Sequence, residues 1–218
     1  MKISYINSMA VICEAVNADV KDVALGMGYD PRIGRDFLQP GPGFGGSCLP
    51  KDSAALLNTA ASIGYDFSLL RGVIEVNSRQ HDHVVEKVRG AVGGDLTGRK
   101  IGVWGLTYKA NTDDLRDSPA LAIAVRLAAS GAEVRAYDPV AGESAAATAP
   151  ELVVVEDPYA VCADADALAV LTEWDEFRWL DFRAIARSMA RRSIVDARNI
   201  LNAVELRHMG FTYQGIGR

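Results

Sequence analysis

One stretch of sixteen residues, Phe37–Asp52, contains four glycines and three prolines. Proline lacks a backbone N–H group and glycine weakens both helices and strands, so a segment this rich in both cannot lie inside a helix or a central strand. The composition predicts a loop whose backbone lies close to another part of the molecule or to a ligand. The fold of this chain must therefore present this glycine-rich loop between regular elements.

Cys48 lies in this loop, directly before a helical pattern that runs from about Lys51 to Ile63. The free N–H groups and the dipole at the start of a helix favour a thiolate and bind anions. Lys51 adds a positive charge, and Asp52 supplies a carboxylate that can hold a water molecule. Together these groups are the components of covalent catalysis at a carbonyl carbon. The alternative is an unreactive buried cysteine in a tight turn.

The composition is that of a globular protein without a bias towards nucleic acid or membranes. The chain has 218 residues, 49% of them hydrophobic, and a net charge of -5. This charge opposes binding to nucleic acid or to an anionic membrane, and no apolar run approaches the length of a transmembrane helix. The cysteines Cys13, Cys48 and Cys162 are widely spaced and form no CxxC pair. They predict free thiols in the cytoplasm, with no disulfide framework and no metal site.

The first 92 residues predict an all-helical region that is interrupted by the glycine-rich loop. Apolar residues recur at helical spacing, Asp19 can cap a short second helix, and Ser68 can cap a long helix that ends near Val92. The pattern begins at Met1 without a capping residue. We therefore expect a chain that starts inside a helix of a longer protein.

The segment Gly93–Asp95 marks a change of pattern, and we place a domain boundary there, between residues 1–92 and 93–218. Strands and helices alternate beyond it, which is typical of a parallel sheet. Ser118 and Pro119 provide the N-cap and the first position of a helix that ends at Gly131. The other expected helices span residues 158–163, 173–189 and 202–209, and the expected strands are Lys100–Gly105, Glu133–Tyr137, Leu152–Val155, Ala167–Leu171, Ser193–Asp196 and Phe211–Gln214.

A second polar loop, Gly105–Pro119, follows the first expected strand. Open α/β sheets bind ligands at the carboxyl ends of their strands, and long loops there are uncommon without such a role. Lys109 and Arg116 offer the positive charge that a diphosphate needs, and Arg198 follows another strand at the same edge. The alternatives are a solvated charge cluster and a surface arginine that pairs with Asp196.

Other signals are weaker. The turn Gly102–Gly105 lacks one glycine of a dinucleotide fingerprint, so nucleotide binding and a plain turn both remain open. Asp138 ends the second strand, where it could contact a ribose or only form a turn. His81 and His83 diverge on one helix and are expected in solvent, whereas the tryptophans, among them Trp179, are expected in the core or at a domain contact.

The run Gly43–Asp52 closely resembles the catalytic loop of the UDP-glucose/GDP-mannose dehydrogenase family. The second polar loop is similar to another signature of that family, Gly-x-x-Phe/Tyr-Lys-x-x-Thr-x-Asp-x-Arg. The resemblance implies an α/β fold, in which an all-helical dimerisation core (1–92) is followed by a Rossmann-like parallel-sheet domain (93–218) that binds UDP. It also implies oxidation of the C6 alcohol of a UDP-sugar to a carboxylate with two NAD.

The resemblance assigns roles to residues at matching positions. Cys48 is implied as the nucleophile that forms a thiohemiacetal and a thioester, and Asp52 as the group that assists water. Arg32 is implied to reach the substrate of the partner subunit in a homodimer, and Lys51 and Arg116 to lie near NAD. The implied substrate-binding residues are Arg32, Phe37, Leu38, Gln39, Pro40, Gly41, Pro42, Gly43, Phe44, Gly45, Tyr108, Lys109 and Arg198.

The glycine fingerprint for NAD and the N-terminal half of the family's chain are absent from these 218 residues. We therefore expect the C-terminal portion of a UDP-glucose 6-dehydrogenase that is inactive alone, with most of the NAD site outside it and an exposed helix face that favours self-association. The alternatives are a GDP-mannose 6-dehydrogenase, a non-catalytic nucleotide-sugar-binding or dimerisation fragment, and a cysteine hydrolase or acyltransferase. No histidine is placed as the base that the last would need.

Overall fold

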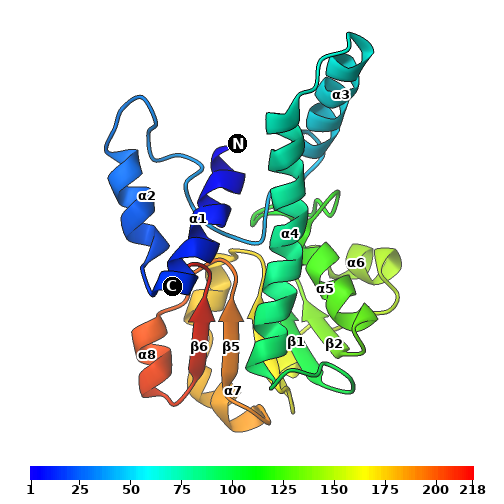
Figure 1. Ribbon diagram of the computed structural model, residues 1–218. Coiled ribbons are helices and arrows are strands. Elements are labelled where there is room, and N and C mark those ends of the chain that lie inside the picture. Colours follow the sequence, from blue (N-terminus) through cyan, green and yellow to red (C-terminus); the bar gives the residue numbers. More distant parts are fainter.

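The computed structural model describes residues 1–218 as a group of helices that stands against a six-stranded sheet (Figure 1). The helical part consists of α1 (Lys2–Val16), α2 (Val20–Gly28), α3 (Leu49–Ser62) and α4 (Ser68–Ala91). The remaining helices are α5 (Pro119–Ala129), α6 (Gly142–Thr148), η1 (Ala160–Cys162), η2 (Asp175–Trp179), α7 (Phe182–Ser188) and α8 (Ala203–His208). The strands are β1 (Lys100–Trp104), β2 (Glu133–Tyr137), β3 (Val153–Val154), β4 (Ala167–Val170), β5 (Ser193–Asp196) and β6 (Thr212–Gly215).

All neighbouring strands pair in parallel, in the order β3-β2-β1-β4-β5-β6. The chain first moves from β1 towards β3 and then returns to add β4, β5 and β6 on the other side. The crevice between the carboxyl ends of β1 and β4 is therefore the position where open α/β sheets bind ligands. The predicted α/β fold with a parallel sheet is confirmed, and β2 and β5 have the predicted bounds.

The expected single helix over 173–189 is wrong. The segment forms the 3₁₀ helix η2 and then α7. The Asp181 side chain accepts hydrogen bonds from the backbone N–H groups of Arg183 and Ala184 and so starts a new helix. The break leaves Trp179 at the end of η2 with 79% exposure, so the prediction of a core position is wrong for this tryptophan, and a domain contact remains a prediction.

Capping follows the sequence at two of three positions. Asp19 accepts the N–H of Lys21 at the start of α2, and Ser118 accepts the N–H of Leu121 at the start of α5. In contrast, Ser68 is already the first residue of α4 and its side chain makes no capping hydrogen bond. Tertiary packing must therefore fix the start of this helix.

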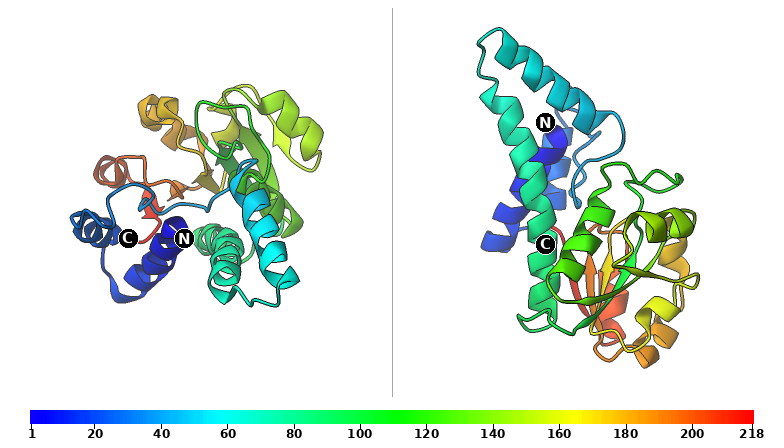
Figure 2. Two further views of the ribbon diagram at one scale, coloured as in Figure 1. Left: turned by 90° about the horizontal axis from the view of Figure 1, so that it is seen from above. Right: turned by 90° about the vertical axis from the view of Figure 1, so that its right-hand side faces the viewer.

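α4 contacts both parts of the molecule. It lies beside α1 along both of its halves, whereas α3 lies beside its N-terminal half and α5 and the sheet pack against its C-terminal half (Figures 1 and 2). A single cluster of buried apolar side chains includes Ile6 of α1, Val84 and Val88 of α4, and Ile101 of β1. The hydrophobic core therefore continues across the segment Gly93–Asp95, and the domain boundary there remains a prediction.

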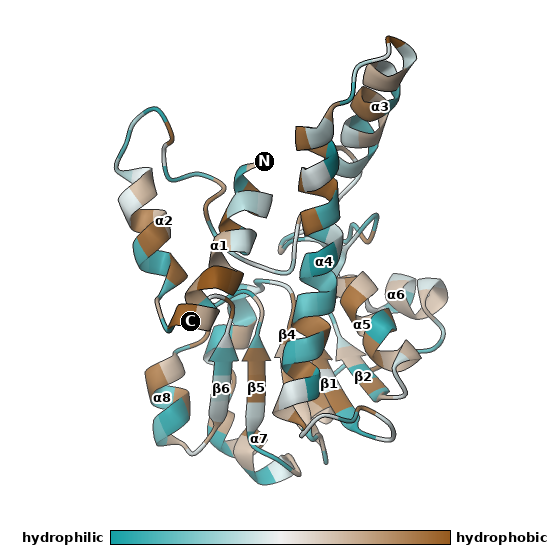
Figure 3. Ribbon diagram, viewed as in Figure 1, coloured by the Kyte–Doolittle hydropathy of each residue, from teal (hydrophilic) through white to brown (hydrophobic).

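The helical part also exposes hydrophobic side chains. α3 and the start of α4 project away from the sheet (Figure 2), and apolar positions occur along their surfaces and on α2 (Figure 3). Leu25, Leu56, Ile63 and Leu69 are between 44% and 77% exposed. Leu56, Ile63 and Leu69 lie on or next to α3 and α4, which contact each other, and exposed apolar groups gathered in this way are typical of an interaction surface.

Glu14 links α1, α4 and the last residues of the chain. Its Oε1 accepts the N–H of Gly217 at 2.7 Å and Nζ of Lys87 at 2.9 Å, and Nε2 of His83 lies 3.1 Å from its Oε2. Burial opposes ionisation, but the contacts with His83, Gly217 and Lys87 outweigh it and lower the pKa of Glu14 to about 2. The folded structure therefore stabilises the ionised form of the Glu14 side chain.

We expect Glu14→Gln to lower the free energy of unfolding by about 2 kcal/mol at pH 7. The carboxyl pKa is lower in the folded state than its usual value of 4.5. The stabilisation by the ionised Glu14 is therefore fully present above pH 4.5 and is lost as the pH falls towards 2. Urea unfolding at pH 7 and pH 3 measures both effects. Glu75→Gln, which removes an exposed ion pair with Arg79 on α4, is the control and should cost at most about 0.5 kcal/mol. Equal losses in the two variants would contradict this role.

Candidate active site

The glycine-rich loop lies between α1 and α4, above the carboxyl edge of the sheet (Figure 1). Gly41 donates its N–H to Oδ1 of Asn7 at 2.9 Å, and its carbonyl oxygen accepts Nε2 of Gln80 at 2.8 Å. Asn77 binds both the N–H and the carbonyl oxygen of Phe44, at 2.8 and 2.9 Å. Because Asn7 and Gln80 are buried, water cannot easily replace these bonds, and the loop backbone has a fixed position.

Gly45 and Gly46 bring this loop into contact with the second polar loop. A Cβ atom on Gly45 would lie 2.1 Å from the carbonyl oxygen of Asp117, which is too close for any side chain. Gly46 has a φ of 84°, and a Cβ there would lie 3.0 Å from the ring of Tyr108. The N–H of Gly46 donates to the carbonyl oxygen of Arg116 at 3.0 Å. The two sequence motifs therefore meet backbone to backbone.

A cavity of about 530 Å³ opens beside this contact. The glycine-rich loop forms one wall, and residues that follow β1, β4 and β5 form the other. This volume is in the range of sites for small organic ligands. The predicted substrate-binding residues that line it are Phe37, Gln39, Pro40, Gly41, Gly43, Phe44, Gly45, Tyr108, Lys109 and Arg198.

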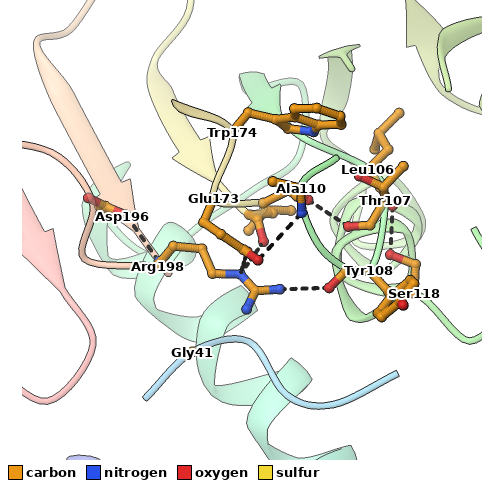
Figure 4. A network of polar contacts seen from close by, with 12 residues as sticks. Gly41, Leu106, Thr107, Tyr108, Ala110, Ser118, Glu173, Trp174, Asp196 and Arg198 are labelled. Atoms are coloured by element: carbon orange, nitrogen blue, oxygen red, sulfur yellow. Dashed lines mark hydrogen bonds and ion pairs between the residues drawn. The ribbon is translucent and has the colours of Figure 1, made fainter. Parts of the chain in front are cut away.

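Arg198 is fixed at this cavity by its neighbours (Figure 4). Its Nε donates to the carbonyl oxygen of Leu171 at 2.9 Å, its Nη2 donates to that of Tyr108 at 3.0 Å, and Oε2 of Glu173 lies 3.0 Å from Nε. Burial lowers the pKa of Arg198, and two nearby carboxylates oppose this effect, so the side chain remains a cation. Nη1 approaches Gly41 and makes no hydrogen bond within the chain.

The guanidinium group of Arg198 is not paired with Asp196. Only the backbone N–H of Arg198 reaches this carboxylate, at 3.0 Å. Asp196 is buried at the end of β5, where burial raises its pKa, while hydrogen bonds from the N–H of Leu201 and the hydroxyl of Tyr213 oppose this shift. The alternative of a surface arginine paired with Asp196 is therefore wrong.

Asp138 supports the crevice from the end of β2. Its carboxylate accepts six hydrogen bonds, from the N–H and hydroxyl of Thr107, the N–H groups of Leu106, Val140 and Ala141, and Nε1 of Trp174. A carboxylate offers about four lone-pair positions. No acceptor is left for a ribose, so the structure supports the turn alternative for Asp138.

Cys48 is the N-cap residue of α3, at the end of the glycine-rich loop. It is exposed, whereas Cys13 and Cys162 are buried, and burial raises the pKa of Cys162 to about 12. The Cys48 side chain does not line the cavity, but its neighbour Leu49 and the nearby Gly45 do. Cys48 is therefore the accessible thiol next to this site.

Asp52 lies one turn into α3, and its N–H donates to the carbonyl oxygen of Cys48 at 2.9 Å. Nζ of Lys51 is 3.9 Å from Oδ1 of Asp52, and both side chains are largely exposed. The predicted thiol, cation and carboxylate thus share the first turn of one helix, on its solvent side.

Comparison with protein families gives matches in both parts of the chain. Residues 1–79 match the central domain of the UDP-glucose/GDP-mannose dehydrogenase family, and residues 102–203 match its UDP binding domain. The chain belongs to this family. The matched regions contain the glycine-rich loop, the second polar loop and Arg198.

Curated relatives within the UDP-glucose/GDP-mannose dehydrogenase family are similar along the whole chain. A UDP-glucose 6-dehydrogenase of Rhizobium meliloti is 47% identical over 218 residues, which are 100% of this chain and 50% of the relative. UDP-glucose 6-dehydrogenase TuaD of Bacillus subtilis is 46% identical, over 100% of this chain and 47% of the relative. The chain therefore spans about half the length of the curated relatives it matches.

Solved structures of the family have the same arrangement. A UDP-glucose dehydrogenase from Pyrobaculum islandicum has a TM-score of 0.83 at 34% identity, over 91% of this chain and 44% of that one. An NDP-N-acetyl-D-galactosaminuronic acid dehydrogenase from Methanosarcina mazei has a TM-score of 0.85 at 28% identity, over 100% of this chain and 48% of that one. The fold therefore occurs in enzymes that are named for different nucleotide sugars.

Several residues implied by the family resemblance lie outside the cavity. Arg32 forms an ion pair with Asp30, and its side chain is 86% exposed. Leu38 and Pro42 are buried, where they support the loop. Arg116 forms two hydrogen bonds with Asp114 and is also exposed. The structure does not bring these side chains together with Lys109 and Arg198.

The cavity is also lined by residues that were not predicted from the sequence: Ile3, Leu49, Glu173, Arg178, Asn199 and Ile200. Glu173 follows β4 at the same edge of the sheet that indicated Lys109 and Arg198, so the same rule could have found it. Arg178 was hidden because its segment was expected to continue as a helix. Asn77 and Gln80 gave no signal, since polar residues are common on a helix surface.

The prediction that His81 is solvated is wrong. The ring lies beside Gly43, both its nitrogens are buried without a partner, and burial, together with the charge of Arg126, lowers its pKa to about 4.

No group of three or more His, Cys, Asp or Glu side chains is arranged to hold a metal ion. None of the helices combines the length and the apolar character needed to cross a bilayer.

Proposed function

We propose that this chain carries the catalytic cysteine and the nucleotide-sugar-binding site of a UDP-glucose 6-dehydrogenase, which oxidises the C6 alcohol of the sugar to a carboxylate with two NAD. One observation carries the proposal: the glycine-rich loop, Lys109 and Arg198 line one cavity, and the exposed Cys48 lies next to it at the start of α3. The names of the curated relatives support the UDP-glucose assignment.

The substrate lies along the cavity, with its diphosphate at the cationic end. Lys109 and Arg198 supply local positive charge in a chain whose net charge is -5. The sugar follows the backbone from Gly41 to Gly45, in the direction of Cys48. The backbone bonds of this segment to α1 and α4 fix its shape before the ligand binds.

Cys48 and Asp52 perform the covalent chemistry. The thiolate of Cys48 attacks the C6 carbon of the aldehyde, a C–S bond forms, and the carbonyl oxygen takes up a proton to give a thiohemiacetal. After oxidation of that carbon to a thioester, water that is oriented by Asp52 adds to it. The C–S bond then breaks, which releases the carboxylate and regenerates the thiolate with the loss of protons to solvent.

When bound, NAD would supply the hydride acceptor for both oxidations. The sheet domain does not fit it, because Asp138, at the position where a ribose would bind, already accepts six bonds from within the chain. We therefore place the NAD site outside the sheet domain. Lys51 and Arg116, which are exposed near Cys48, are the residues of this chain that approach it.

A homodimer through the helical part completes the proposal. An apolar cavity of about 730 Å³ lies between α1 and the first turns of α4, and Tyr5, Leu69 and Val73 contribute to it. Burial of this surface against a second copy would remove the exposed apolar groups from water. Arg32, which is exposed and outside the cavity of its own chain, reaches the substrate of the partner subunit. The free cysteines favour a cytoplasmic location.

Calorimetric titration of the chain with UDP-glucose, GDP-mannose and NAD tests this function. We expect UDP-glucose to bind, NAD not to bind, and Lys109→Ala to weaken UDP-glucose by at least about tenfold through the loss of a charge-assisted contact. Binding of GDP-mannose alone would identify a GDP-mannose 6-dehydrogenase instead. UDP-glucose that binds equally well to the Lys109→Ala variant would place the ligand elsewhere, and NAD binding would overturn the assignment of its site.

A further inference from the structure

Glu173 is a carboxylate in a cavity that is proposed to receive a diphosphate. Its side chain is 35% exposed and lines this cavity together with Lys109 and Arg198. Two like charges in one site repel each other, so a negative side chain here should weaken the binding of phosphates. Its presence therefore requires a different physical reason.

The contacts of Glu173 close a ring with Arg198 and with the backbone of Tyr108 and Ala110 (Figure 4). Oε1 accepts the N–H of Ala110 at 3.4 Å, and Oε2 lies 3.0 Å from Nε of Arg198. Nη2 of Arg198 in turn donates to the carbonyl oxygen of Tyr108 at 3.0 Å. Because Tyr108 and Ala110 flank Lys109, the ring connects Arg198 to the turn that carries Lys109.

The ring also places a negative charge beside the largely buried guanidinium group of Arg198. The Arg198 side chain is only 16% exposed, and a guanidinium group that is this far removed from water needs a negative partner to stay in place. The N–H at Nε points to the carbonyl oxygen of Leu171, and Glu173 acts on the same nitrogen by its charge. Nη1 then remains as the free donor that approaches Gly41.

We propose that Glu173 is a positioning residue, which holds the guanidinium of Arg198 and the turn of Lys109 at a fixed spacing so that both cations meet the same diphosphate. This inference rests on the proposed function. The gain in preorganisation exceeds the repulsion between Glu173 and the phosphates, because a cation that is already oriented loses no side-chain entropy when it binds.

Titration with UDP and with uridine, followed by NMR, separates positioning from simple charge. We expect Glu173→Gln and Glu173→Asp each to weaken UDP by about tenfold and to leave uridine unchanged. If Glu173 acted only by charge repulsion, Glu173→Gln would bind UDP more tightly and Glu173→Asp would bind it unchanged. Glu151→Gln removes an equal charge at an exposed position without an ion pair and is the matched control. UDP binding that is unchanged or tighter in Glu173→Gln overturns the inference.

A second measurement needs no ligand. The Nε–H resonance of Arg198, assigned by its loss in Arg198→Lys, should exchange slowly with solvent in the wild-type chain and at least about tenfold faster in Glu173→Gln. If wild-type chain does not bind UDP, the proposed function fails, but this exchange rate still decides whether Glu173 holds Arg198. An unchanged rate contradicts the positioning role.

Discussion

Gly45→Ala should lower the affinity of the chain for UDP-glucose by about 100-fold or more. The added Cβ would lie 2.1 Å from the carbonyl oxygen of Asp117, and this contact is between two backbones, so no side chain can rotate to relieve it. The glycine-rich loop must then separate from the second polar loop, and the wall of the cavity moves away from Lys109. Calorimetry measures the affinity, and urea unfolding shows whether the variant remains folded.

Gly26→Ala is the matched control for this substitution. Gly26 lies in α2, its φ is not positive, and a Cβ there would meet no atom within 4 Å. Because alanine is a better helix former than glycine, we expect unchanged ligand affinity and a gain of about 0.5–1 kcal/mol in the free energy of unfolding. If Gly45→Ala bound UDP-glucose as well as Gly26→Ala does, the contact between the two loops would not be needed for the site.

Asp138→Asn should lower the free energy of unfolding by about 3–5 kcal/mol. The side chain keeps its shape, but whichever carboxylate oxygen becomes an amide group then faces N–H donors. Oδ1 accepts two of the six hydrogen bonds and Oδ2 accepts four, so either orientation leaves buried donors without an acceptor. Urea unfolding of both proteins at pH 7 measures the loss.

Asp113→Asn provides the comparison for Asp138→Asn. Asp113 belongs to the second polar loop at the same edge of the sheet, but it is exposed and takes part in no ion pair. The same chemical change there should alter the free energy of unfolding by less than about 0.5 kcal/mol. A small loss in Asp138→Asn, similar to that of Asp113→Asn, would mean that water or backbone movement satisfies the freed donors.

The sequence predicted the elements of the sheet domain well, because each is marked by local chemistry. Alternating strand and helix patterns gave the parallel sheet, and Ser118 and Pro119 gave the start of α5. The failure at 173–189 also has a local cause, but the apolar pattern hides it. The apolar pattern there is compatible with one helix, but the side chain of Asp181 accepts hydrogen bonds from two backbone N–H groups and starts the separate helix α7.

The sequence motifs of the candidate site could be predicted, but the contacts between its residues could not. Cys48, Lys109 and Arg198 stand out by residue type and by their position at loops or strand ends. Asn77 and Gln80 do not, because a polar residue on a helix is compatible with solvent as well as with the backbone of a loop 33 and 39 residues away. Only the packing of α1, α4 and the loop decides between these outcomes.

α4 is one uninterrupted helix whose middle carries the amides that grip the glycine-rich loop and whose end is embedded beside the sheet. Because α4 is continuous, it leaves no hinge between the glycine-rich loop and the carboxyl edge of the sheet. Under the proposed function, the fixed distance between these two elements sets the length of the ligand, and we expect a nucleotide sugar with a longer or shorter bridge between its two ends to bind more weakly.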